Sequence, residues 1–198
     1  MFPLTELLGF LTGVINVWLL TRRNVWNWPF GLSNNALYIA VFLSSGLYGD
    51  AALQVLYIVL GIYGWIHWWR SARGNAESRA VAVTKTTLAT WQWLIPTTIA
   101  GALILSWFLD RFTDSTVPVW DSATTSISLA ATFGQARKLL ESWWLWILAD
   151  LIYIPLYIYK GLWLTAGLYL IFFAICIVGL REWRTALFNR SNLIRTDY

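Results

Sequence analysis

The chain has 198 residues, of which 58% are hydrophobic, 17% are aromatic and only 12% are charged, and its formal net charge is +4. The charged share is about half of that in soluble globular domains, so a soluble fold would leave large apolar patches in water. The composition therefore excludes an ordinary soluble domain and predicts a membrane protein whose outward apolar faces contact lipid.

Seven mainly apolar runs are long enough to cross a bilayer as helices, since about 20 residues span a hydrocarbon core of ~30 Å. The first run lacks the basic segment and the small-residue cleavage site of a signal peptide, so we interpret it as a helix. Short glycine-containing turns separate the second run from the third and the sixth from the seventh. The predicted membrane helices cover residues 4–20, 26–44, 49–69, 88–109, 119–135, 143–159 and 163–181.

The lysines and arginines indicate how these helices are oriented. If seven helices alternate in direction, twelve of the fourteen basic residues lie on one side of the membrane, and only Arg111 and Lys160 lie on the other. Cytoplasmic loops hold the excess of basic residues, so we expect the N-terminus outside and the C-terminus in the cytoplasm. The basic residues are spread over four loops beside the helices, which argues against nucleic-acid binding.

The third predicted helix ends in the aromatic stretch GIYGWIHWW, next to a basic segment. Amphipathic rings favour the headgroup layer, so we expect Trp65, Trp68 and Trp69 at the cytoplasmic interface. His67 lies among them, and we interpret it as an interfacial residue; a proton relay is the alternative.

An internal repeat appears when the sequence is shifted by 115 residues. Residues 22–68 then align with 137–183 without a gap, and eleven of the 47 positions are identical, where shared composition alone would give roughly five. Each repeat holds three helices, and the single helix between them gives both repeats the same orientation. The sequence thus predicts parallel repeats in a three-plus-one-plus-three arrangement that encloses a central pathway.

This arrangement defines the predicted domains. The first three-helix repeat covers residues 1–70 and the second covers 119–184. They are joined by a cytoplasmic linker, 71–87, and a linking helix, 88–109, and the chain ends in a frayed cytoplasmic tail, 185–198.

Polar residues within the predicted helices indicate where a substrate binds, since polar groups in hydrocarbon usually face the bundle interior. Asp150 shares one helical face with Trp146 and Tyr153, and Asn35 is its equivalent in the first repeat. Gln54 and Tyr57 lie in the third helix, whereas the fifth carries Gln135 and a row of hydroxyl residues for which packing and binding are both open. Such a pocket suits a flat, polar, neutral or cationic small molecule.

The sequence resembles the PnuC family of bacterial nicotinamide riboside transporters. The stretches that carry this resemblance are WNWPFG, LYGDAALQVLYIVLGIYGWIHW and, above all, residues 121–183. The resemblance implies a SWEET-like seven-helix fold, often assembled as a homotrimer, in the bacterial inner membrane. It also implies facilitated diffusion of nicotinamide riboside, which a cytoplasmic kinase traps by phosphorylation. The matching positions of the family's pocket are Gln54, Tyr57, Gln135, Trp143, Trp146, Asp150 and Tyr153.

Three alternatives remain at this point. Relatives in the same superfamily carry thiamine or riboflavin, which are also aromatic and unphosphorylated. A membrane receptor could use the same pocket without transport. An enzyme is not expected, because the chain has one His, one Cys and no catalytic motif, and for the same reason we expect no metal and no cofactor.

Overall fold

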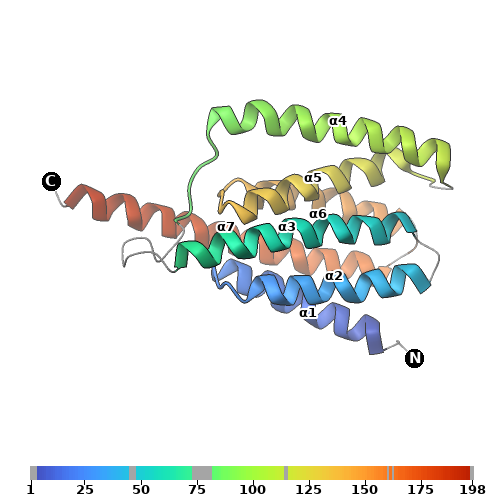
Figure 1. Cartoon of the computed structure of the whole chain (residues 1–198), viewed down its shortest axis with the longest axis horizontal. Helices are drawn as coiled ribbons and strands as arrows, with labels where there is room; N and C mark the ends of the chain where they lie inside the picture. The colour runs from blue at the N-terminus through green and yellow to red at the C-terminus, as the bar shows by residue number, and fades with distance from the viewer. Residues whose placement is uncertain are drawn as a thin grey trace. The chain divides into compact units, whose positions relative to one another are not determined.

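The computed structural model describes residues 4–44, 48–72, 82–113, 116–159, 161 and 163–196. Over these residues the chain forms seven helices and no strand, as Figure 1 shows from blue α1 to red α7, so the all-helical prediction is confirmed. The helices are α1 (Leu4–Thr21), α2 (Asn27–Ser44), α3 (Tyr48–Ala72), α4 (Leu88–Phe112), α5 (Pro118–Ala136), α6 (Ser142–Tyr159) and α7 (Trp163–Thr196).

The C-terminal helix is much longer than predicted. The sequence indicated a helix over 163–181 followed by a frayed tail, but α7 continues to Thr196. After Leu180 the chain becomes polar without any proline or glycine, and Arg, Glu, Ala and Leu are good helix formers. The apolar run therefore ends where the predicted span ends, whereas the helix does not.

Four helices are long and apolar enough, within the described residues, to cross a membrane. Helix α1 contains a shorter apolar stretch, Leu8–Thr21, whereas α2 and α5 carry asparagines, serines and threonines that lower their hydropathy. In α5 these polar residues are buried: Ser122, Thr124 and Ser128 are each 1% exposed. Helix α4 is the opposite case: Leu94 is buried, whereas Leu103 and Ile104 are each 67% exposed. The four candidate spans are Ala51–Ser71, Leu88–Phe112, Ser142–Tyr159 and Ala166–Asn189.

The chain divides into two compact units. The first contains Met1–Val83, Ala136–Lys138 and Arg181–Tyr198, and the second contains Thr84–Gln135 and Leu139–Leu180. The predicted domain boundaries stay predictions. Three features named from the sequence lie outside the described residues: the glycine turn around Gly46, the central part of the linker, 73–81, and Lys160.

In the first unit, α2 packs against both α1 and α3 (Figure 1). Helix α1 ends in a Schellman motif, in which Arg23 has a positive φ of 56°. The Arg23 N–H donates to the Leu20 carbonyl at 2.9 Å and the Asn24 N–H donates to the Leu19 carbonyl at 3.0 Å. The Asn24 side chain then accepts the N–H of Trp26, which starts the chain on its way into α2.

Trp28 holds α2 and α3 together. A Cβ added at Gly64 of α3 would lie closer than 3.0 Å to atoms of the Trp28 ring, so only glycine leaves room for the indole. The Trp28 ring also packs perpendicular to the buried ring of Trp68, with 5.4 Å between centroids and an interplanar angle of 90°. This geometry is a favourable edge-to-face aromatic contact.

The second unit repeats these features 115 residues later. Helices α6 and α7 begin at residues 142 and 163. These positions lie 115 residues after the starts of α2 and α3, at 27 and 48. The Leu139 N–H donates to the Gly134 carbonyl at 2.8 Å, as Asn24 does to Leu19. A Cβ at Gly179 would meet the buried ring of Trp143 as one at Gly64 would meet Trp28. These equivalences support the sequence repeat, whose orientation in the membrane stays a prediction.

The end of the linker is bound more firmly than the sequence indicated. Thr84 pairs with Leu139 in an isolated parallel bridge, and its carbonyl accepts the N–H of Leu140 at 2.9 Å. The Glu141 carboxylate accepts the N–H and the hydroxyl of Thr86 at 2.8 and 2.7 Å. The linker thus anchors to the α5–α6 turn before Thr87 caps α4.

Trp68 is buried rather than interfacial, which corrects the prediction for this residue. It is 2% exposed, whereas its neighbours Trp65 and Trp69 are 39% and 47% exposed. Its Nε1–H donates to the Ala136 carbonyl at the end of α5, and the repeat-equivalent Trp183 donates to the Leu20 carbonyl near the end of α1. Each repeat thereby supplies one indole to the first helix of the other repeat.

Lys138 is a buried cation beside Trp68. It is 5% exposed, has a positive φ of 52°, and its Nζ lies over the Trp68 ring at 4.0 Å from the centroid. The ring favours the charged form. Burial and the charge of Arg23 oppose it and lower the pKa of Lys138 from 10.5 to about 8. The folded protein therefore binds fewer protons here than the unfolded chain between these two pH values.

We predict that adding a methyl group at Gly179 destabilises the fold. Gly179→Ala forces Cβ into the buried Trp143 ring, and overpacking of this kind costs roughly 1–3 kcal/mol. Thermal unfolding of the purified protein in detergent measures the effect. The matched control is Gly167→Ala in the same helix, where nothing lies within 4 Å, and this variant should be as stable as the parent or more stable. Equal melting temperatures for the two variants would contradict the close contact between Gly179 and the Trp143 ring.

We also predict a pH dependence from Lys138. Because its pKa is lower in the folded state, the free energy of unfolding should increase as the pH rises from about 8 to 10.5. Lys138→Met removes this proton and should flatten the rise, whereas Lys85→Met, at an exposed position, should keep the parental profile. Chemical unfolding across this pH range measures the slopes. A parental slope in Lys138→Met would show that other groups cause the rise.

Candidate functional site

A cluster of tyrosine rings lies between α6 and α7 in the second unit. Tyr153 and Tyr157 are four residues apart on α6 and stack with 5.7 Å between ring centroids. Tyr169 of α7 lies 4.6 Å from Tyr153 and 5.0 Å from Tyr157, and Phe172 lies 5.9 Å from Tyr169. The tyrosines are half-buried, so the cluster offers ring faces and edges to a flat molecule.

Hydroxyl groups of α5 hold one of these rings. The Tyr153 side chain is hydrogen-bonded to Thr124 and Ser128, which are four residues apart and buried. The Thr124 hydroxyl donates to carbonyls of its own helix at 2.9 and 3.0 Å, and the Ser128 hydroxyl donates to the Thr125 carbonyl at 3.0 Å. Each hydroxyl oxygen can therefore still accept from the tyrosine O–H. These two residues position Tyr153 on α6.

Asp150 lies on the same side of α6, one turn before Tyr153, and is 1% exposed. The Cys176 side chain on α7 is hydrogen-bonded to its carboxyl group. Among the described residues nothing hydrogen-bonds the other carboxyl oxygen, Oδ2, or the buried Nε1–H of Trp146, one turn earlier. Buried polar atoms without partners are costly, so a donor and an acceptor left open on one helix face indicate a place for a ligand.

The eight residues predicted from the sequence fall into both units. Gln135, Trp143, Trp146, Asp150 and Tyr153 belong to the second, and Asp150, Trp146 and Tyr153 share one face of α6. Gln135 is buried near the end of α5, and Trp143 is buried against Gly179, so the structure gives Trp143 a packing role. A substrate contact for either residue stays a prediction.

Asn35, Gln54 and Tyr57 belong to the first unit, where all three are half-buried. The neighbouring Asn34 has a structural role, since its amide donates to the Gly9 carbonyl at 2.6 Å and to the Thr12 hydroxyl at 3.1 Å. Asn16 of α1 lies next to Gly31, which is one turn before Asn35 on α2. Side-chain atoms of Asn16 would be 3.2 Å from a Cβ added at Gly31.

Comparison with known proteins identifies the family. The model of the nicotinamide mononucleotide transporter family matches residues 3–185. The chain belongs to this family. It is 27% identical to the nicotinamide riboside transporter PnuC of Escherichia coli, over 94% of this chain and 87% of that protein. It is 26% identical to the riboflavin/roseoflavin transporter RibM of Streptomyces davaonensis, over 90% of this chain and 84% of that one.

A solved structure confirms the fold of the family. The crystal structure of the vitamin B3 transporter PnuC has a TM-score of 0.72 and 22% identity to this chain, and the match covers 92% of this chain and 81% of that one. The resemblance to PnuC seen in the sequence is thus confirmed. The family and these relatives are transporters and not enzymes, so the chain is a multi-pass membrane transporter of a small molecule.

Within this PnuC-type transporter, Tyr169 and Phe172 were missed as site residues although the sequence held a signal for them. Subtracting 115 from their numbers gives 54 and 57, which are the predicted site residues Gln54 and Tyr57. Applying the repeat in both directions would therefore have found them. Cys176, which was not among the predicted site residues either, is the residue that hydrogen-bonds Asp150.

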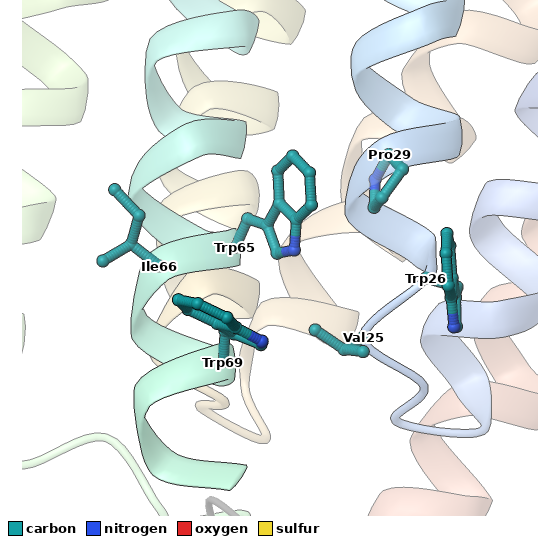
Figure 2. Close-up of a pocket in the computed structure, with 6 residues that line it drawn as sticks. All are labelled: Val25, Trp26, Pro29, Trp65, Ile66 and Trp69. Atoms are coloured by element: carbon teal, nitrogen blue, oxygen red, sulfur yellow. The ribbon is translucent and has the colours of Figure 1, made fainter. Parts of the chain in front are cut away.

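A groove in the first unit contains none of the predicted site residues. It is a groove of about 510 Å³ between α3 and the start of α2, shown in Figure 2. Trp65 and Trp69 project from α3 toward the side on which Val25, Trp26 and Pro29 lie. All the lining residues are apolar, so this groove lacks the polar groups that orient a vitamin. They are Val25, Trp26, Pro29, Trp65, Ile66 and Trp69.

Proposed function

We propose that this PnuC-type transporter carries nicotinamide riboside by facilitated diffusion across the bacterial inner membrane. The observation that carries the proposal is the buried Asp150, whose Oδ2 has no partner among the described residues, beside a cluster of tyrosine rings. Nicotinamide riboside combines a flat pyridinium cation with ribose hydroxyls. A carboxylate and ring faces attract the cation, and open polar groups bind the hydroxyls.

The partners of this transport follow from the same family likeness. A cytoplasmic kinase that phosphorylates the vitamin traps it inside, because a phosphate would fit poorly beside the tyrosine rings and the Asp150 carboxylate. The concentration gradient then drives uptake, and no coupling ion is needed. Homotrimer assembly belongs to the proposal on the ground of the resemblance to PnuC.

The main alternative substrate is riboflavin, as the relative RibM is named a riboflavin/roseoflavin transporter. Its isoalloxazine ring is neutral and would leave the Asp150 carboxylate without a counter-charge. Thiamine carries a cationic thiazolium and would satisfy the carboxylate, but it has no ribose. The charge of Asp150 therefore favours the two cations over riboflavin. A receptor that binds without transport is the remaining alternative.

We predict that Asp150→Asn lowers nicotinamide riboside uptake by roughly 10- to 100-fold, because a hydrogen bond to a charged group contributes about 1.5–3 kcal/mol. Uptake of radiolabelled nicotinamide riboside, thiamine and riboflavin into proteoliposomes measures this. The matched control is Asp110→Asn, at an exposed position near the end of α4, which should leave uptake unchanged.

Each alternative has its own signature in this assay. Uptake of riboflavin alone, unaffected by Asp150→Asn, would make the protein a riboflavin transporter. Label that stays on the vesicle surface without accumulating would indicate a receptor. Uptake that requires an imposed proton or sodium gradient would contradict facilitated diffusion.

The proposed orientation places the N-terminus outside and the C-terminus in the cytoplasm. In a Cys176→Ala background, which removes the chain's only cysteine, single cysteines at Ser71, Thr113 and Thr185 report the sides. A membrane-impermeant maleimide added to intact cells should label Thr113→Cys and spare the other two. Labelling of all three after the membrane is opened is the control. The reverse pattern in intact cells would show the opposite orientation.

A further inference from the structure

The apolar groove of the first unit is a surface feature with a distinct chemical character. It is lined by the six residues of Figure 2, and three of them are indoles that are partly open: Trp26 is 62%, Trp65 39% and Trp69 47% exposed. Exposed indoles gather where a membrane protein leaves the hydrocarbon for the headgroup layer. The groove is therefore suited to an acyl chain at that depth.

Positive charge lies at one end of the groove. Arg70 follows Trp69 directly and lies one helical turn beyond Ile66, toward the C-terminal end of α3. Arg23 precedes Val25 by two residues, and both arginines are exposed. The sequence has no acidic residue in 20–44 or 51–72, so nothing in these stretches neutralises the two cations. An apolar groove with two exposed arginines beside it in the sequence matches a lipid with an anionic headgroup.

The repeat shows that the fold does not require aromatic or aliphatic residues at three positions of the groove. The positions 115 residues after Trp26, Ile66 and Trp69 hold Glu141, Arg181 and Arg184. Glu141 forms hydrogen bonds to Thr86 of the linker. Three of the six lining positions are thus charged in the second repeat, whereas the other three remain apolar. Packing of the fold alone therefore does not explain the aromatic groove of the first.

We propose that this groove binds one anionic glycerophospholipid, with an acyl chain along Trp65 and Trp69 and the phosphate at Arg70 and Arg23. The basic end of the groove would then lie in the headgroup layer, where arginines attract phosphate and indoles tolerate both water and hydrocarbon. A second copy of the chain is a less favourable occupant, because it would bring a further set of arginines to the same surface.

Native mass spectrometry of the purified full-length protein tests this proposal. The protein is equilibrated with phosphatidylglycerol or phosphatidylcholine of the same acyl chains. We expect one phosphatidylglycerol per chain to be retained in preference to phosphatidylcholine. Arg70→Gln should reduce that preference about fivefold. Trp69→Ala should reduce retention of both lipids, because it shortens the wall along the acyl chain.

Two control variants change the same residue types in the second unit. Arg111→Gln near the end of α4 removes an exposed arginine, and Trp163→Ala at the start of α7 removes an indole that is 70% exposed. Both should bind phosphatidylglycerol as the parent does. The proposal would be overturned if these controls lowered phosphatidylglycerol retention as much as Arg70→Gln does. It would also be overturned if the parent protein showed no preference for phosphatidylglycerol over phosphatidylcholine. If Trp69→Ala dissociated an oligomer without changing lipid retention, another chain would cover the groove, and the proposal would be overturned.

Discussion

The fold depends on one contact that occurs twice: a tryptophan at the start of the second helix of each repeat fills the space left by a glycine in the third. Trp28 faces Gly64, and Trp143 faces Gly179. An indole buries a large apolar area, and a glycine lets the helix backbone approach it without a side chain between them. Both partners are needed, because a larger residue at the glycine would push the ring out of its place.

This contact also positions the candidate site. Helices α6 and α7 run from Ser142 and Trp163 and are joined by a turn at Gly161, whose φ is +73°. They are therefore antiparallel neighbours, and residues later on α6 pair with residues earlier on α7. Once Trp143 is fixed at Gly179, Asp150 comes to Cys176 and Tyr153 comes to Tyr169. The rings and the carboxylate are thus held on rigid helices rather than on loops.

The sequence predicted the helices well because their signal is local. Six of the seven predicted segments agree with the observed helices to within a few residues, since apolar length and glycine turns decide both. The end of α7 was misplaced because hydropathy marks where lipid ends and not where hydrogen bonding ends. The docked linker at Thr84–Thr86 was missed for another reason: its partner Glu141 is 55 residues away, and no local pattern encodes that pairing.

The site was predictable along each helix and not between helices. Periodicity placed Asp150, Trp146 and Tyr153 on one face, but the hydrogen bonds of Tyr153 to Thr124 and Ser128 depend on how α5 lies against α6. Helix α5 is too polar to count among the four candidate spans, because its buried face is made of hydroxyl residues. Those hydroxyls are neutral and are hydrogen-bonded to their own helix and to the tyrosine, so they carry no charge into the site. Asp150 is the charged residue buried on this face of α6, and under the proposed function its carboxylate is balanced by a cation that arrives with the ligand.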